Sequence, residues 1–253
     1  MATLNRDGVE LYYEVHGEGP AILLTHGYSA TSRMWRGQIE ALSLRHRLVL
    51  WDMRGHGGSS YPDDPAQYSE AATVADMAAL LDAVGAETAI VGGLSLGGYM
   101  SLAFHAVHPA RVRALLIFDT GPGYRNEEAR ARWNETVEAT ARKLETGGLA
   151  HLRKLSPERA GSEHRSADGL IRAARGMLTQ HSARVIDSLP GIHVPALVAV
   201  GAEDEPFLNP TDYMAAKIPG AVKIVIPNAG HAANIDQPEA FNRAVAEFLE
   251  RIG

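Results

Sequence analysis

Hydrophobic positions along the chain follow two patterns, short continuous apolar runs and longer stretches with helical spacing. The apolar runs lie at residues 21–25, 47–51, 89–91, 114–118, 194–200 and 222–226. Runs of this kind are typical of parallel strands buried on both faces. The helical stretches lie at residues 32–44, 69–84, 96–107, 211–218 and 237–252. This alternation predicts an α/β fold, a mostly parallel sheet with helices on both faces.

Two regions of the chain, one near its start and one in its second half, differ from this pattern. Leu11–His16 is rich in β-forming residues and follows the turn pair Asp7-Gly8, so it is predicted to be a strand and one arm of a hairpin. Residues 121–193 contain no convincing strand but do contain helical spacing, as at Trp133 and Val137. We expect residues 1–120 and 194–253 to form the core and 121–193 to form an inserted helical cap.

A serine between glycines marks the centre of the chain. Gly93-Leu94-Ser95-Leu96-Gly97 follows an apolar run and precedes a helical stretch, which matches the nucleophile elbow G-x-S-x-G. Such a turn holds serine at positive φ and leaves no room for a Cβ two positions before or after it. The next helix points its free N–H groups at the serine, which suits acyl transfer. Ser95 is therefore the candidate nucleophile.

The elbow predicts an acid and then a histidine later in the chain, each after a strand. His231, on the glycine-containing loop after the last apolar run, is the candidate general base. Asp204, just past residues 194–200, is the candidate acid that orients it. Its neighbours Glu203 and Glu205 are not excluded by sequence, and Asp119, at the end of another predicted strand, is the other candidate.

An oxyanion formed in acyl transfer needs two backbone N–H donors. Leu96, directly after the serine, is predicted to supply one, and Tyr28, after the run at residues 21–25, is predicted to supply the other. The Tyr28 side chain is also a candidate for the pocket. In the cap, Trp133 either lines an apolar substrate pocket or only pins the cap to the sheet.

Composition narrows the class of partner. The chain has 253 residues with 24 basic and 30 acidic side chains, a net charge of −6, and no cysteine. This balance gives no electrostatic basis for binding nucleic acid or an anionic membrane. The absence of cysteine excludes disulfides and thiolate metal sites, and together with a start that lacks an apolar leader it favours a cytoplasmic location. Monomer and homo-oligomer both remain open.

Cofactor chemistry finds no support in the motifs. Residues 55–60 lack the third glycine of a dinucleotide fingerprint, and His105 and His108 have no neighbouring carboxylate with ligand spacing. We therefore expect no cofactor and no metal. The cap arginines are expected to form a solvated face with glutamate partners, although one of them is open to an anionic substrate: Arg125, Arg130, Arg132 and Arg142.

Elbow, acid and histidine in this order resemble the α/β-hydrolase superfamily over nearly the whole chain. His26-Gly27, residues 52–59, Gly93–Gly98 and Gly230-His231 are similar to the small capped group of carboxylesterases, enol-lactonases and cofactor-free haloperoxidases. The resemblance implies an eight-stranded sheet with one antiparallel early strand. It also implies that residues 52–59, including Arg54 and His56, are mostly structural.

Departures from related enzymes favour one chemistry. Ser95 stands where alkyl-enzyme hydrolases carry aspartate, and Leu94 stands where carbon–carbon-bond hydrolases typically carry asparagine. Tyr28 replaces the tryptophan or phenylalanine common in haloperoxidase-like members. The resemblance thus implies hydrolysis of small-molecule carboxylic esters or lactones through an acyl-enzyme. Perhydrolase-like chemistry, carbon–carbon bond hydrolysis and low-turnover ligand binding stay open as alternatives.

Overall fold

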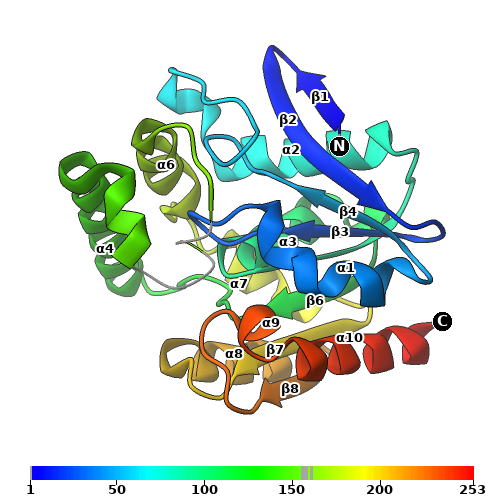
Figure 1. Ribbon diagram of the computed structural model, residues 1–253. Coiled ribbons are helices and arrows are strands. Elements are labelled where there is room, and N and C mark those ends of the chain that lie inside the picture. Colours follow the sequence, from blue (N-terminus) through cyan, green and yellow to red (C-terminus); the bar gives the residue numbers. More distant parts are fainter. Residues whose placement is uncertain (1, 155–158, 160–161) are drawn as a thin grey trace.

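The computed structural model describes residues 2–154, 159 and 162–253. Its eight strands form one sheet in the order β1-β2-β4-β3-β5-β6-β7-β8 (Figure 1). The strands are β1 (Ala2–Arg6), β2 (Val9–His16), β3 (Ala21–Thr25), β4 (Arg47–Trp51), β5 (Ala89–Leu94), β6 (Val112–Phe118), β7 (Ala196–Gly201) and β8 (Val222–Ile226). Strand β2 pairs antiparallel with both of its neighbours, and all other pairs are parallel. The predicted fold class and the implied antiparallel strand are confirmed.

Helices connect these strands. The α-helices of the described residues are α1 (Arg36–Ser43), α2 (Glu70–Ala83), α3 (Leu96–Val107), α4 (Glu127–Gly147), α6 (Ala167–Ala173), α7 (Arg184–Ser188), α8 (Glu205–Lys217), α9 (Ala233–Asp236) and α10 (Pro238–Ile252). Short turns of other helix types are η1 (Ser32–Trp35), η2 (Pro65–Gln67), η3 (Pro109–Arg111), η4 (Gly148–Lys154), η5 (Ala174–Leu178) and η6 (Leu189–Gly191). None of the helices among the described residues is both long and apolar enough to cross a bilayer.

The sheet is covered on both faces, as its continuous apolar strands require. On β3, Leu23 packs into a cluster with Met77 of α2 and Phe104 of α3. Its neighbour Leu24 points the other way, into a cluster with Phe241 of α10. Alternate residues of one buried strand thus feed two separate cores.

Two boundaries differ from the sequence prediction. The hairpin has a first arm, β1, which the sequence pattern did not resolve; Asp7 and Gly8 turn it with φ of 54° and 82°. Helix α8 begins at Glu205 and not at Thr211, because Pro206 lies in the first turn, where the missing N–H breaks no bond. The earlier start matters for the site, since it carries additional side chains toward the end of β7.

Between β6 and β7 the described residues form helices and no strand. Helices α4 and α6 pack together, and Figure 1 shows both beside the core at one end of the sheet. Residues 155–158 and 160–161 of the expected cap, 121–193, lie outside the described residues.

Candidate active site

Ser95 lies in the turn between β5 and α3. Its φ is 55° and its ψ is −118°, a conformation that side chains seldom adopt. A Cβ on Gly93 would approach the Thr25 carbonyl oxygen to 2.5 Å, and one on Gly97 would collide with the same oxygen. Close packing against β3 therefore requires both glycines, as the elbow pattern predicts. The turn is held from β6, since Ser95 N donates to Phe118 O at 2.9 Å.

Asp204 and His231 meet at the same edge of the sheet. Asp204 precedes α8, His231 lies on the loop after β8, and His231 Nδ1 is 2.8 Å from Asp204 Oδ2. The Asp204 side chain is 5% exposed and that of His231 is 25% exposed. Because a carboxylate only accepts hydrogen bonds, Nδ1 carries the proton and Nε2 is left as an acceptor. Glu203 and Glu205 are exposed, and Asp204 is the acid that contacts the histidine.

Asp119 lies at the end of β6 with a different set of contacts. Its Oδ1 accepts a hydrogen bond from Gly201 N at 2.8 Å, and its Oδ2 is buried without a partner among the described residues. Burial, with the nearby Asp204 carboxylate, raises the pKa of Asp119 well above its usual range. Its hydrogen bond joins β6 to β7, and the structure does not pair it with His231.

A cavity of about 490 Å³ opens beside Ser95. Its walls come from the elbow, the segment after β6, helix α4, the 178–186 segment and helix α8. The lining residues are Ser95, Leu96, Tyr99, Thr120, Gly121, Pro122, Gly123, Tyr124, Trp133, Leu178, Gln180, Ile186, Pro206, Phe207, Asn209, Pro210 and Tyr213. The lining is mostly apolar and aromatic, the usual character of a small-molecule site.

Phe207 contacts His231 and also lines the cavity beside Ser95. It lines the cavity with Ser95, and its ring stacks on His231 with centroids 5.0 Å apart. Within the described part of the chain, Ser95 Oγ and His231 do not form a hydrogen bond. In ligand-free enzymes the nucleophile-to-base bond is often long and shortens when substrate binds. Sequence analysis missed Phe207 because the start of α8 was placed too late.

The loop after β3 lies next to the serine. A Cβ on Gly27 would be 3.5 Å from Ser95 Cβ, so the backbone at Tyr28 is near the elbow. The Tyr28 side chain is buried, and its hydroxyl donates to Leu170 O of α6 at 2.9 Å. That side chain is not among the residues that line the cavity. Leu96, the first residue of α3, does line it.

Trp133 is one of the residues that line the cavity. Its Nε1 donates to Leu178 O at 2.9 Å, which ties α4 to the 178–180 segment within residues 121–193 and not to the sheet. Val137 and Leu144, on the same helical stripe, are buried in the core.

Arg125, Arg130, Arg132 and Arg142 are not among the residues that line this cavity. Arg125 pairs with Asp187 at 2.6 Å, and Arg142 pairs with Glu138 at 3.1 Å on the same helix. Neither arginine lines the cavity. In the described residues, no group of three or more histidine and acidic side chains is arranged to hold a metal ion.

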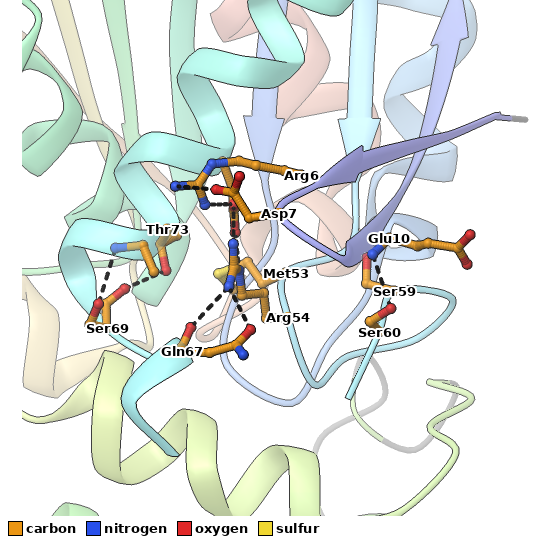
Figure 2. Close-up of polar contacts among 12 residues, drawn as sticks. Arg6, Asp7, Glu10, Met53, Arg54, Ser59, Ser60, Gln67, Ser69 and Thr73 are labelled. Atoms are coloured by element: carbon orange, nitrogen blue, oxygen red, sulfur yellow. Dashed lines mark hydrogen bonds and ion pairs between the residues drawn. The ribbon is translucent and has the colours of Figure 1, made fainter. Parts of the chain in front are cut away.

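Arg54 is part of a buried ion pair. Its Nε and Nη2 donate to Asp76 of α2 at 2.6 and 2.8 Å, and Arg6 donates to the same carboxylate. Figure 2 shows the Arg54 guanidinium reaching toward Gln67 and the start of α2. Bidentate pairs of this kind fix geometry. The contacts of Arg54 therefore join the loop after β4 to β1 and α2.

His26 binds the backbone through both ring nitrogens. Its Nδ1 is 2.7 Å from Gly27 O, and its Nε2 accepts from Met53 N at 2.9 Å. A carbonyl needs a donor and an N–H needs an acceptor, so the ring is neutral in one tautomer. Burial lowers the pKa of His26 to about 4.

His56 and His164 are bound in the same way. His56 Nδ1 lies 3.0 Å from Arg54 O, and its Nε2 accepts from Ser29 N at 3.2 Å. His164 Nε2 lies 3.0 Å from Ser29 O, and its Nδ1 accepts from Gly57 N at 3.2 Å. Burial lowers the pKa of both rings. The His56 bonds join the loops after β3 and β4, and those of His164 join both loops to the segment between β6 and β7.

Comparison with protein families decides the lineage. The model of the "Alpha/beta hydrolase family" matches residues 22–244. The chain belongs to this family. Its curated relatives include a putative carbamate hydrolase from Caulobacter sp., 30% identical over 94% of this chain and 95% of the relative. A putative 2-succinyl-6-hydroxy-2,4-cyclohexadiene-1-carboxylate synthase from Bacillus subtilis is 28% identical, with both chains fully covered.

Solved structures agree with the lineage. A thermophilic esterase from Thermogutta terrifontis superimposes with a TM-score of 0.81 at 30% identity, covering 99% of this chain and 97% of that one. An enol-lactonase from Burkholderia xenovorans gives a TM-score of 0.79 at 28% identity, covering 98% and 100%. This α/β hydrolase thus resembles enzymes whose names describe different reactions, and these names do not identify a single substrate class.

Proposed function

We propose that this α/β hydrolase cleaves carboxylic esters or lactones through an acyl-enzyme on Ser95. His231 takes the proton of the Ser95 hydroxyl and later returns it to the leaving alcohol. Asp204 orients the imidazole and stabilises its charged form. Water then attacks the acyl-enzyme with His231 as base, which releases the acid and restores the serine.

The observation that carries this proposal is the Asp204–His231 pair, whose histidine stacks on Phe207 of the cavity that the strained Ser95 also lines. The 2.8 Å contact leaves His231 with one free acceptor nitrogen, and the positive φ of Ser95 presents its hydroxyl at the cavity. A free acceptor on an oriented imidazole and an exposed hydroxyl are what a general base and nucleophile need.

Two further parts of the proposal concern charge and shape. The backbone N–H groups of Tyr28 and Leu96 form the oxyanion hole, supported by the closeness of the Gly27 backbone to Ser95. Residues 121–193 act as a cap that shapes the substrate pocket, with Trp133 on its wall. The enol-lactonase and esterase among the similar structures support ester and lactone chemistry.

A fluorophosphonate probe tests the nucleophile directly, since it labels only an activated serine. We expect the wild-type protein to be labelled at Ser95, and the Ser95→Ala variant to be unlabelled and to show no acylation burst with p-nitrophenyl acetate. Equal bursts in the two proteins would exclude the covalent serine mechanism.

Chain-length profiles test the cap. Trp133→Ala is expected to change the ratio of kcat/KM between short and long p-nitrophenyl esters by about 10-fold, because each pocket methylene contributes ~1–3 kcal/mol. Trp133→Phe keeps an aromatic ring while removing the Nε1 bond to Leu178, and serves as the matched variant for the pinning role. If the chain-length dependence of kcat/KM keeps its shape in Trp133→Ala and only Tm falls, Trp133 has a structural role and does not select the substrate.

A further inference from the structure

The cavity beside Ser95 is lined without formal charge. Among the described residues on its wall, none is acidic, basic or histidine. Burying a carboxylate or ammonium against such a wall is costly, whereas an apolar neutral chain is accommodated well. The uncharged polar side chains on the wall are therefore the groups that can orient a bound substrate.

One of these polar side chains belongs to a segment held rigidly by α4. Asn134 Nδ2 donates to Gln180 O at 2.9 Å, and Gln180 N donates to Asn134 Oδ1 at 2.9 Å. The bond from Trp133 to Leu178 O fixes the same segment two residues earlier. Because these bonds engage backbone groups of 178 and 180, they hold the segment in place without using the Gln180 side chain.

The Gln180 amide is also fixed in its orientation. Gln180 is 8% exposed, and its Oε1 accepts from Tyr124 N at 3.2 Å. A backbone N–H requires the oxygen at that place, so the amide cannot be reversed. The Nε2 group is then the end left for a ligand, since it has no hydrogen-bond partner in the described part of the chain and is not fully buried. Because Gln180 is one of the residues that line the cavity, this unpaired donor belongs to a side chain of its wall.

We propose that Gln180 determines specificity by donating from Nε2 to an oxygen acceptor on the substrate chain that fills the cavity. The preferred substrate is an uncharged ester or lactone whose chain is apolar except for one carbonyl, amide or ether oxygen. Such a chain satisfies the Gln180 donor, whereas a plain alkyl chain displaces water from it without replacing the hydrogen bond. The inference rests on the proposed esterase function and specifies its substrate class.

The test compares matched substrates that differ by one oxygen. Two series are measured: p-nitrophenyl alkanoates with an oxo group at successive positions along the acyl chain, and acetates of oxoalkyl alcohols, each against its methylene analogue. In wild type we expect one oxo position to raise kcat/KM by about 10-fold, the value of one net hydrogen bond. Gln180→Glu keeps an oxygen for Tyr124 N but removes the donor, so this preference is expected to disappear.

Two more variants separate the donor from folding and charge. Gln180→Met is apolar and of similar length, and it is also expected to lose the preference. Gln67→Glu makes the same chemical change outside the cavity and is expected to keep it. A preference that survives in both Gln180 variants, or the lack of any oxo preference in a wild type that fluorophosphonate labels, would overturn the inference alone. Lack of fluorophosphonate labelling would overturn the proposed function and the inference together.

Discussion

Two regions of this hydrolase combine histidine with aspartate and use them in opposite ways. After β3 and β4, His26 and His56 bind backbone groups through both ring nitrogens, and Asp52 accepts N–H bonds at both carboxylate oxygens. After β7 and β8, His231 binds Asp204 through Nδ1 alone. The first region is saturated and the second keeps one basic nitrogen.

The difference shows that residue type and closeness do not separate the pair we propose as catalytic from a structural one. Both regions lie at the carboxyl ends of strands, and both place histidine beside glycine. What differs is the number of hydrogen-bonding positions left for a substrate. A saturated imidazole can accept a proton only by breaking a bond to the backbone, whereas His231 has an acceptor ready.

The largest effect is expected from removing the free nitrogen. His231→Ala should lower kcat for p-nitrophenyl acetate by about 10⁴-fold or more, and the double variant with Ser95→Ala should be hardly worse, because the two act as a unit. His56→Ala should lower Tm while the folded protein keeps its acylation burst. The comparison would fail if both histidine variants lost the burst at unchanged Tm.

The two aspartates should separate in the same way. Asp204→Asn is expected to lower kcat by about 10³-fold or more with little change in KM, since the carboxylate orients a histidine and does not bind substrate. Asp52→Asn brings an amide donor against the N–H of Ser32 or Gly58, and should lower the unfolding free energy by about 1–3 kcal/mol with kcat preserved. Steady-state kinetics measures kcat and urea unfolding measures the unfolding free energy of each variant. A larger loss of kcat in Asp52→Asn than in Asp204→Asn would show that Asp204 is not the acid that orients His231.

The saturated region should also impose a pH dependence on stability. The pKa of His26 is lowered by burial to about 4, against about 6.5 in the unfolded chain. The unfolded state therefore binds more protons in this window, so the stability is complete above pH 6.5 and falls as the pH drops toward 4. His26 contributes a slope of about 1.4 kcal/mol per pH unit. Urea unfolding of wild type and His26→Asn between pH 6.5 and 4.5 should show a shallower slope in the variant, and equal slopes would contradict this account.

The smallest effect is expected at Asp119. Burial raises the pKa of Asp119 and so favours its neutral form more than in an ordinary carboxyl, and asparagine is its neutral isostere with an oxygen still available to Gly201 N. Asp119→Asn should change kcat by less than about threefold, or about 0.7 kcal/mol in activation free energy. Asp119→Leu leaves Gly201 N unpaired and should lower Tm. A large loss of kcat in Asp119→Asn would give this carboxyl a direct role in the reaction.

The sequence predicted most of the sheet because buried parallel strands have a pattern of their own. Strand β1 was not resolved, since Ala2–Arg6 is a largely exposed edge strand with little apolar content. The start of α8 was missed because Pro206 and Pro210 both suggest a helix break. Pro206 lies in the first turn, where proline costs no hydrogen bond, and Pro210 is accommodated inside the helix. Residue propensity thus located the buried strands and helices. It failed for the exposed strand β1 and for the start of α8, where the effect of a proline depends on its position in the helix.

Ser95, Asp204 and His231 were singled out because strand ends and spacing restrict which loops can meet. The family resemblance implied a structural role for His56, but the partners of His26 and His56 could not be identified from the sequence, since backbone groups carry no residue-specific mark. Trp133 was a sequence candidate for the cavity wall, whereas Gln180 was not. Gln180 reaches it only through its pairing with α4, a contact between segments far apart in the chain.

The hydrogen bonds that hold the 178–180 segment use its backbone, whereas contacts with a substrate would use its side chains. Trp133 and Asn134 bond to peptide groups at positions 178 and 180, and every residue except proline provides those groups. These bonds therefore do not depend on which side chains stand at positions 178 and 180, although the Gln180 side chain adds its own bond to Tyr124 N. A library randomised at Leu178 and Gln180 would vary selectivity while α4 still holds the backbone of the segment, which makes it a natural place to engineer new substrates into the enzyme.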